Sequence, residues 1–453
     1  MDALPKGHHV LFDEGSPGTF IRPASDGGDG SFGCGGLTGE LTAAHYVGIG
    51  MEPQTPQAPM QEEPFLGFFR GDVHRELASH REQRPVTPLR LPGGGTGWLL
   101  TRHDDVRKAL ADPRLVKDGQ LSPLGLRPQL PPDIYAATAQ NMLTVDPPDH
   151  TRLRRLIQGA FTARRIGRLV PAITATADHL IDELSTPGSH DLISKFAFPL
   201  PITVICELLG VPADDRGSFM EAASIIASGP NRIRELPGAM IGMIGYIRDL
   251  VGNKRRHPGD DLISAMIAMR DSGEQLTEDE LVSTVYLLLL AGYDTTGNLI
   301  GNGAWLLLDD PTRWSQIRAD PDQLPQVIEE VLRYESPVQL GTHRKATEDV
   351  TYGDQIIPAG STVLLSILAA HRDAGQYTDP DAFDMGRAWS PHLAFGHGIH
   401  HCLGAPLARL EARIAFTRLA ARLPGLRLAE GFTPRWRASA LMHGLEELPV
   451  TTS

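Results

Sequence analysis

The chain has 453 residues, with 42 Lys or Arg and 55 Asp or Glu, so its formal net charge is −13. Such an acidic balance argues against general nucleic-acid binding, while 41% hydrophobic residues are enough for a sizeable core. The three cysteines (Cys34, Cys206 and Cys402) form no disulfide framework, and no apolar run reaches the ~18 residues of a membrane span, so we expect a soluble cytoplasmic protein without membrane or nucleic-acid partners.

The first 60 residues differ from the rest of the sequence. They hold 12 of the 47 glycines and only two basic residues, Lys6 and Arg22, and they lack apolar periodicity. Such a composition buries too little apolar surface to offset the conformational entropy lost on folding. We expect residues 1–60 to be a flexible N-terminal extension and residues 61–453 to form one large domain.

Regular structure is expected from about Pro64. Residues 86–91 and 98–101, separated by a glycine cluster, predict a β-hairpin, and residues 104–111 predict a short helix. Residues 117–135 are rich in Pro, Gly and Leu and predict a loop. The region that follows has the apolar spacing of helices, with ends expected at proline and glycine signals that include Pro171, Pro187, Pro212, Pro230 and Pro258.

One long helix is expected over residues 278–308. Thr277 followed by Glu280 is a capping-box pattern, and no proline occurs between this signal and Pro311. The helix is hydrophobic on nearly every side, which indicates that it crosses the middle of the protein.

The chain then changes to short strands and turns. Residues 350–352, 355–357 and 362–367 predict strands, residues 371–390 have little periodicity, and a last long helix is expected from about Leu403. The predicted fold class is therefore mostly α with small β-sheets.

A glycine-rich loop, residues 395–404, delivers Cys402 to the start of the last helix. Its glycines allow the backbone to pass close to a flat ligand, and the free N–H groups of the helix start favour a thiolate, so we expect a lowered pKa for Cys402. A buried structural cysteine and a zinc site built from His397, His400, His401 and Cys402 are the alternatives, although no second pair of zinc ligands follows at a suitable spacing.

The middle of the predicted long helix contains residues that are unfavourable in the interior of a helix. Ala291-Gly292-Tyr293-Asp294-Thr295-Thr296 combines a glycine, a carboxylate and two adjacent threonines. A threonine hydroxyl that bonds to the carbonyl one turn back would loosen the helix and leave a notch, with an acid and an alcohol beside it. A kinked helix with a hydrogen-bonded aspartate is the alternative.

These two motifs together resemble those of the cytochrome P450 haem-thiolate monooxygenases. Residues 395–404 match F-x-x-G-x-H-x-C-x-G, and residues 291–296 match A-G-x-[DE]-T-T. The resemblance extends from about Pro64 to the C-terminus and is closest to the soluble bacterial enzymes that tailor macrolides and related natural products. It implies the cytochrome P450 fold, with haem b held by the Cys402 thiolate and bordered by Ala291, Phe395 and Gly404.

The resemblance also assigns roles to residues outside the two motifs. Glu330 and Arg333 are spaced to form an ion pair on one helix face, and the family uses such a pair with a later arginine, here Arg387, to lock the loop that supports the cysteine. Four basic residues are implied to hold the two haem propionates: His150, Arg154, Arg344 and His400.

The implied reaction inserts one oxygen atom from dioxygen into a C–H bond, or epoxidises an alkene, with Asp294 and Thr295 delivering protons. A peroxygenase and a haem sensor or carrier are the rival interpretations, and the acid–alcohol pair argues against both. The sequence has no cysteine cluster for an iron–sulfur module, so electrons are expected from a ferredoxin and its reductase. Four arginines are expected to steer the acidic donor to the cysteine side: Arg152, Arg155, Arg409 and Arg413.

The substrate is expected to be a largely apolar organic molecule, such as a macrolide or other polyketide, because the residues assigned to the pocket are apolar or small. They lie in the loop of residues 117–139, in the long helix, in residues 338–341 and near the C-terminus, and include Leu287, Leu290, Val338, Leu340 and Leu441.

Overall fold

The structure is a computed structural model that describes residues 63–64, 73–91, 95–117, 130–227, 232, 234–271, 276–388 and 391–452. The chain divides into two compact units, Met1–Gln61 and Glu62–Ser453, and all described residues belong to the second unit. The expected flexible extension, residues 1–60, lies outside the described residues.

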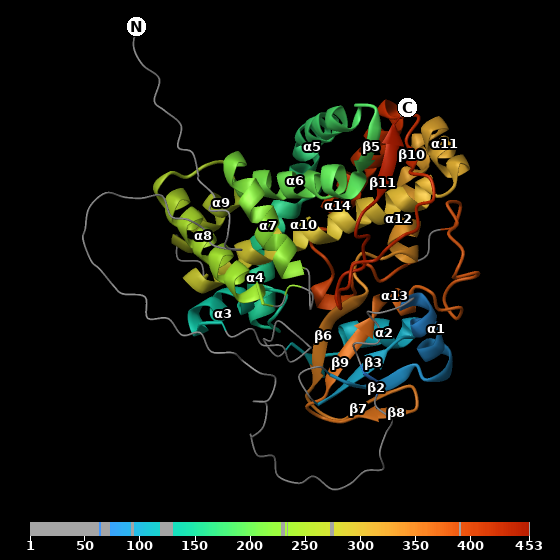
Figure 1. The fold of residues 1–453 in the computed structure, drawn as a ribbon. Helices are drawn as coiled ribbons and strands as arrows, with labels where there is room; N and C mark the ends of the chain where they lie inside the picture. The colour runs from blue at the N-terminus through green and yellow to red at the C-terminus, as the bar shows by residue number, and fades with distance from the viewer. Residues whose placement is uncertain are drawn as a thin grey trace, which may run out of the picture. The chain divides into compact units, whose positions relative to one another are not determined.

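Helices make up most of the described chain (Figure 1). The first part of the chain contributes α1 (Val73–Gln83), α2 (His103–Ala111), α3 (Pro132–Ala139), α4 (Asp149–Gln158), α5 (Ala163–Leu184), α6 (Pro199–Leu209) and α7 (Arg216–Ala227). The second part contributes α8 (Leu236–Arg256), α9 (Leu262–Asp271), α10 (Glu278–Leu308), α11 (Pro311–Ala319), α12 (Leu324–Tyr334), α13 (Ile367–Ala370) and α14 (Ala405–Arg422).

The strands form one main sheet and two small ones. The main sheet has the order β1 (Glu63–Pro64), β2 (Val86–Arg90), β3 (Thr96–Leu100), β9 (Thr362–Ser366), β6 (Leu340–Ala346) and β4 (Leu115–Val116). Here β2 and β3 form the expected antiparallel hairpin, and β9 joins β3 in parallel. The small sheets contain β10 (Arg427–Leu428), β11 (Pro449–Thr452) and β5 (Gly188–Asp191), and β7 (Val350–Tyr352) and β8 (Gln355–Ile357).

The predicted central helix is confirmed at both ends. The Thr277 hydroxyl accepts a hydrogen bond from the Glu280 N–H at 3.1 Å, and the Glu280 carboxylate accepts one from the Thr277 N–H at 2.8 Å. Most of α10 is buried, and it packs against α3, α6, α8 and α14. In Figure 1 it runs through the middle of the helices, while the main sheet lies to one side with α1, α2 and α13.

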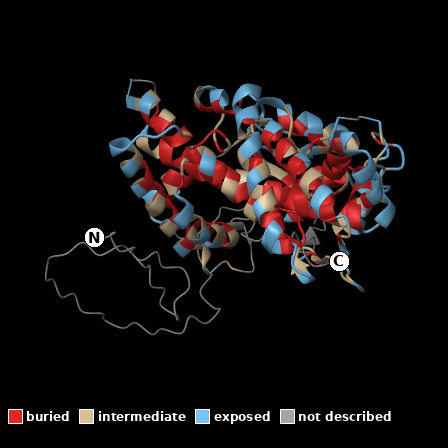
Figure 2. Cartoon of the chain, turned by 90° about the horizontal axis from the view of Figure 1, so that it is seen from above, coloured by how far each residue is buried: buried red, intermediate tan, exposed pale blue. Residues whose placement is uncertain are grey.

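The core lies between the facing sides of the helices, and their outer faces are exposed (Figure 2). One large cluster of buried residues joins the helices around α10, and two smaller clusters lie on the main sheet. No helix in the described ranges is both long and apolar enough to cross a membrane.

The prediction that a helix ends at Pro171 is wrong, because α5 continues through it. A proline inside a helix has no N–H to bond to the carbonyl four residues earlier, here that of Gly167. Both residues are exposed, so water can solvate that carbonyl. On the opposite face, buried Ile166 and Ile173 attach the helix to the core, which outweighs the lost hydrogen bond.

The predicted loop over residues 117–135 is only partly right. Residues 118–129 lie outside the described residues, and α3 begins at Pro132. The Pro131-Pro132 pair that suggested a loop instead opens the helix, because proline is well suited to the first helical turn, where no N–H is needed.

Candidate active site

The cysteine loop (residues 395–404) is shaped by its glycines. Gly396 and Gly398 have φ angles of 73° and 74°, in the left-handed region that favours glycine. A Cβ on Gly398 would lie 3.1 Å from the Leu110 carbonyl oxygen and 3.2 Å from the Ala111 Cα, so a side chain there would crowd the end of α2. The Cys402 N–H donates to the Phe395 carbonyl at 2.8 Å, which closes the loop just before α14 begins.

The sequence predicted a lowered pKa for Cys402, but the protein groups around the thiol raise it. Although Cys402 is an exposed residue, desolvation by the surrounding protein raises the pKa of its thiol, while the N–H groups of Gly404 and Ala405, together with Arg154 and Arg409, act in the opposite direction. The helix start therefore offsets only part of the desolvation of the sulfur. A metal cation at Sγ would supply the positive charge that stabilises the thiolate.

Of the predicted propionate ligands, His400 belongs to this loop and His150 and Arg344 lie close to it, and all three are buried or half-buried. The rings of His150 and His400 are 4.4 Å apart, and burial lowers the pKa of both, that of His400 to about 2 with help from Lys117 and Arg344. Both ring nitrogens of His150 and Nε2 of His400 are buried and lack a well-formed hydrogen bond among the described residues, although the Ile399 backbone interacts with His150. Burial also lowers the pKa of Arg344 to about 10, against the opposing charge of Asp146.

This arrangement fits the two carboxylates of haem. Buried polar nitrogens without partners are costly, and a planar group carrying anionic tails would satisfy them. The register of β6 against β9 shifts between Gly341 and Arg344, an irregularity of the kind that redirects a side chain from the sheet. The fourth predicted ligand, Arg154, donates through one nitrogen to the His401 carbonyl at 2.8 Å and so contacts the cysteine loop directly.

An accessible stripe interrupts the buried surface of α10. Ala291 is exposed and Leu287, Leu290 and Thr295 are half-buried, whereas the neighbouring Leu288 and Leu289 are buried. These positions share one helix face. The Thr295 hydroxyl donates to the carbonyl of Ala291, one helical turn earlier, at 2.5 Å. The sequence predicts this hydrogen bond. The stripe is therefore where a ligand can reach this helix.

Asp294 is buried on the neighbouring face and is paired with a residue that the sequence analysis missed. Its Oδ1 accepts a hydrogen bond from Nη2 of Arg437 at 2.7 Å and lies 3.4 Å from Nδ2 of Asn298. The acid and the alcohol thus use different partners. Arg437 is 143 residues away in sequence, so no local pattern could reveal it; only the rule that a buried carboxylate needs a cation points to such a partner.

The predicted triad of Glu330, Arg333 and Arg387 is brought together in the structure. Arg333 binds the Glu330 carboxylate through two nitrogens, at 2.7 and 2.8 Å, and Nε of Arg387 approaches it at 3.1 Å. Both arginines also donate to backbone carbonyls between residues 371 and 382. The triad therefore ties α12 to the coil that leads into the cysteine loop.

Two of the arginines assigned to donor docking are held in ion pairs. Arg409 binds the Glu329 carboxylate at 2.6 and 2.7 Å, and its guanidinium carbon lies 4.4 Å from the centre of the Phe395 ring. Although burial opposes it, hydrogen bonds from Arg409 and His392 hold the pKa of Glu329 down to about 2. Arg152 bonds to Glu280 and Asp149. Arg155 and Arg413 are exposed.

The predicted pocket residues fall into two groups. Leu287 and Leu290 lie on the accessible stripe of α10. Val338 pairs through a β-bridge with Met442, and Leu441 is 45% exposed, unusual for a large apolar side chain, whereas Leu340 is buried in β6. The part of the predicted 117–139 lining that precedes Leu130 lies largely outside the described residues.

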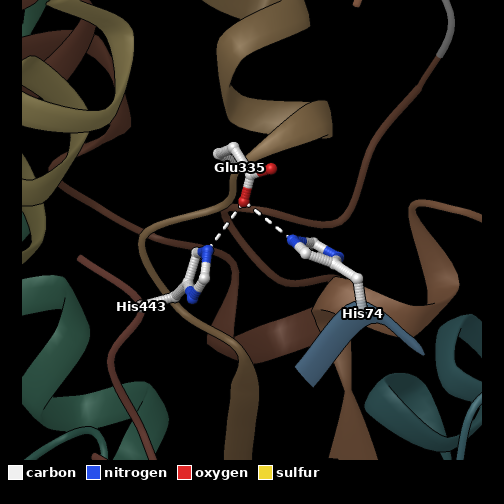
Figure 3. Close-up of side chains that lie close together, drawn as sticks. All are labelled: His74, Glu335 and His443. Carbon is white, nitrogen blue, oxygen red and sulfur yellow. Dashed lines mark hydrogen bonds and ion pairs between the residues drawn. The ribbon is translucent and has the colours of Figure 1, made fainter. Parts of the chain in front are cut away.

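A histidine–glutamate cluster, buried at Glu335 and His443 and half-buried at His74, lies outside the predicted site (Figure 3). His74 and His443 place Nε2 at 2.9 and 2.7 Å from the same oxygen of Glu335, and Arg372 donates to the other oxygen at 3.0 Å. Burial acts to raise the pKa of Glu335, yet the imidazoles hold it well below its usual range. An ionised carboxylate only accepts hydrogen bonds, so both imidazoles donate to it, and the cluster clamps α1 to the C-terminal part of the chain.

Comparison with known proteins identifies the family. A family model described as cytochrome P450 matches residues 243–422. Cytochrome P450 107B1 of Saccharopolyspora erythraea is 46% identical over 396 residues, which cover 85% of this chain and 96% of that protein. The chain belongs to the cytochrome P450 family. The predicted fold is confirmed, and the protein is a haem-dependent monooxygenase that takes electrons from separate redox proteins.

Two further cytochrome P450 proteins are similar to this chain, one in sequence and one in its solved structure. The 6-deoxyerythronolide B hydroxylase of S. erythraea is 42% identical over 391 residues, covering 84% of this chain and 96% of the relative. The solved structure of the monooxygenase TamI bound to tirandamycin C superposes with a TM-score of 0.79 at 41% identity, covering 85% of this chain and 98% of that one. Family membership therefore favours an enzyme over a sensor or carrier.

Proposed function

We propose that the Cys402 thiolate would ligate the haem iron and that His150, Arg154, Arg344 and His400 would bind the propionates. Haem, when bound, activates dioxygen for insertion of one oxygen atom into a C–H bond or for epoxidation. In this proposal Phe395 and Gly404 border the haem on the cysteine side and Ala291 on the side of α10. Arg154 holds the cysteine loop through the His401 carbonyl.

One observation carries this assignment more than any other. Both ring nitrogens of His150 and Nε2 of His400, although buried, lack a well-formed hydrogen bond among the described residues, and buried Arg344 lies close enough to lower the pKa of His400. Positive or donating groups collected this way in a protein interior indicate an anionic ligand. Their position next to the loop of Cys402 supports haem as that ligand and argues against the zinc alternative.

We propose that Thr295 and Asp294 deliver protons to the reacting oxygen. Thr295 lies on the accessible stripe of α10, and Asp294 is the next residue along the chain. The Thr295 hydroxyl can pass on a proton and take one back from protonated Asp294, and the resulting carboxylate then takes up a proton from solvent, so both residues end the cycle as they began it. This role separates the monooxygenase from a peroxygenase, which would not depend on the pair.

We propose that the substrate is a largely apolar natural product of the macrolide or other polyketide type. The accessible leucines of α10 and the exposed Leu441 support an apolar ligand. The names of the relatives that act on 6-deoxyerythronolide B and bind tirandamycin C support the same class.

We propose that a ferredoxin, itself reduced by a reductase, supplies the electrons at the cysteine side of the protein. A cleft of about 410 Å³ beside the cysteine loop holds two arginines, Arg107 and Arg409, and two carboxylates, Asp104 and Glu329. Its histidines, His103, His397 and His401, have pKa values lowered by burial. Exposed Arg155 and Arg413 add positive charge from α4 and α14. A local basic surface on an acidic protein would steer an acidic ferredoxin.

A reconstituted assay tests the proposed function. The holoenzyme is first screened spectrally against natural-product scaffolds for displacement of the distal ligand, and binders are then incubated with ferredoxin, reductase and reduced nicotinamide. We expect oxygenated product and substrate-dependent nicotinamide oxidation. Product formed only with added peroxide would favour the peroxygenase instead, and binding without any product would favour a sensor or carrier.

A further inference from the structure

Three side chains of the types that bind transition metals meet at one carboxylate oxygen (Figure 3). Nε2 of His74 and Nε2 of His443 lie 2.9 and 2.7 Å from Oε2 of Glu335, and one ligand atom from each residue lies within 4.8 Å of the others. The two histidines are 261 and 108 residues from Glu335 in sequence. The fold therefore collects two imidazoles and a carboxylate from three separate parts of the chain.

Glu335 and His443 are fixed to each other through their backbones. Nδ2 of buried Asn302, on α10, donates to the carbonyls of both residues at 3.1 and 3.0 Å. The His443 N–H donates to the Pro337 carbonyl at 2.8 Å, and its ring stacks on the Trp436 ring at 3.9 Å. Metal ligands need this kind of support to keep a common focus. These two residues form the rigid half of the cluster.

Arg372 orients the Glu335 carboxylate through the oxygen that faces away from the histidines. Its Nη2 donates to Oε1 of Glu335 and to the Tyr334 carbonyl, both at 3.0 Å, and its Nη1 lies 3.1 Å from the Asp381 carboxylate. A carboxylate that binds a metal through one oxygen is commonly hydrogen-bonded in this way. Because Arg372 shares its charge between two carboxylates, Oε2 keeps negative charge that a cation can neutralise.

His74 closes the cluster from the first turn of α1. Its side chain is 24% exposed, compared with 3% for Glu335 and 3% for His443. The His74 ring meets the His443 ring edge-on, with the ring centres 5.5 Å apart. An ion can therefore enter from the side of His74, while the other two ligands stay buried.

We propose that His74, Glu335 and His443 form a zinc site that fastens α1 to the end of α12 and to the chain that follows α14. Two imidazoles and one carboxylate suit Zn²⁺, whereas Mg²⁺ and Ca²⁺ prefer oxygen ligands alone. A water molecule from the accessible side completes the tetrahedron. The site is separate from the cysteine loop and from the residues assigned to oxygen chemistry.

Zinc binding needs only a small rearrangement of the cluster. Ligand atoms about 2.1 Å from a tetrahedral zinc ion are roughly 3.4 Å apart, so each Nε2 has to move about 0.5–0.7 Å further from Oε2. Each neutral imidazole now donates its proton from Nε2. When zinc takes that place, the ring carries its proton on Nδ1 instead, so both rings stay neutral. The three side chains are thus satisfied by hydrogen bonds without the ion and by coordination with it.

Zinc titration of the haem-loaded, chelator-treated protein tests the site, with magnesium chloride as the negative control. Three quantities are measured: bound zinc per chain, the unfolding temperature, and X-ray absorption at the zinc edge, which the haem iron does not disturb. We expect one zinc ion per chain and an unfolding temperature that rises with zinc concentration, because the ion binds the folded chain. The absorption spectrum should show two imidazoles and oxygen ligands.

Two variants and a matched control locate the ion. His74→Gln and His443→Gln each keep an N–H that can donate to Glu335 but lose an imidazole ligand. Each should weaken zinc binding by at least the roughly 10- to 100-fold that changes around a metal ligand cause, and should remove the zinc-dependent rise in unfolding temperature. His179→Gln, at an exposed histidine of α5, should match the wild type.

Two results would overturn the proposal: a wild type that binds no zinc, or zinc binding that is equal in His74→Gln and His179→Gln, which would place the ion elsewhere. If His443→Gln does not fold, His74→Gln and the wild-type absorption spectrum still decide the question. A zinc spectrum with sulfur ligands, or with fewer than two imidazoles, would also show that this cluster is held by hydrogen bonds alone.

Discussion

Two opposing effects act on the ionisation of the Cys402 thiol. Desolvation of the sulfur disfavours the thiolate, whereas nearby N–H groups and arginines favour it. A bound iron would decide the balance. We expect the reduced carbon-monoxide complex of the wild type to show the red-shifted Soret band of thiolate-bound haem and Cys402→Ala to lack it. The matched control is Cys206→Ala: Cys206 is a free cysteine buried in α6 and should not affect the band. A band that persists in Cys402→Ala would remove the assignment.

Thr295 contributes a hydroxyl at the accessible stripe of α10. Thr295→Ala should still bind haem and substrate but release more of its reducing equivalents as peroxide, because loss of a positioned proton donor costs roughly 10²- to 10⁴-fold in a proton-transfer rate. The ratio of product to nicotinamide measures this. Thr295→Ser should retain much of the ratio, and Thr296→Ala, a change at the buried neighbour, should not redirect electrons. An unchanged ratio in Thr295→Ala would contradict the relay.

Glu411 is a buried acid in α14 that the sequence did not single out. Burial raises its pKa to about 8, compared with 4.5 for an ordinary glutamate. The folded protein therefore keeps this proton over a range in which the unfolded chain has lost it, and the residue destabilises the fold as the pH rises from about 4.5 to 8. The slope is at most ~1.4 kcal/mol per pH unit.

Glu411→Gln should remove this pH-dependent penalty. Chemical unfolding at a series of pH values should give equal stabilities for the wild type and the variant near pH 4, and a more stable variant above pH 8. The control is Glu430→Gln, at an exposed position, where no such divergence is expected. Parallel curves for Glu411→Gln and the wild type would show that Glu411 is ionised in the fold.

At the scale of elements, the sequence predicted the helix ends that are set by nearby residues, such as caps and prolines. The bounds of α10 follow from the capping box at Thr277 and from Pro311, so both ends could be read from the sequence. The end expected at Pro171 was wrong because burial of the opposite face of α5 outweighs one lost hydrogen bond, and that burial is a tertiary effect. The helix α3 was missed because a proline pair marks a loop and a helix start equally well.

The same limit applies to the site. Pairs within one helix, such as Glu330 with Arg333 or Thr295 with the Ala291 carbonyl, follow from the spacing of three or four residues. The partner of Asp294 is Arg437, and the partners of Glu335 are His74 and His443, each brought in from a distant part of the chain. A sequence shows that a buried carboxylate needs a partner, but the fold decides which cation reaches it.

For the whole molecule, we propose that residues 61–453 form the monooxygenase domain and that residues 1–60 are a flexible extension. The composition of the extension lacks the pattern of a core, so deletion of residues 1–59 should leave haem content and turnover close to those of the full chain. The haem-to-protein ratio and the rate with a bound substrate measure this. A truncated protein that fails to fold or to bind substrate would show that the extension packs on the domain.

Electron supply is also a property of the whole molecule, because an acidic protein must present a basic face to an acidic donor. Of the four arginines first considered, Arg152 and Arg409 are held in ion pairs, so exposed Arg155 and Arg413 are the better test. Arg155→Glu combined with Arg413→Glu should slow ferredoxin-driven turnover several-fold, most strongly at low salt, since screening weakens steering.

Peroxide-driven turnover bypasses the ferredoxin and provides the internal control for this charge reversal. It should remain unchanged in the double variant, as should the thiolate Soret band. A charge-matched variant on α11 and β10, Arg318→Glu with Arg427→Glu, changes the net charge equally at positions outside the cysteine side and should have a much smaller effect. Equal slowing of both double variants would mean that net charge alone governs the encounter, and loss of peroxide-driven turnover would mean that the substitutions damaged the haem site.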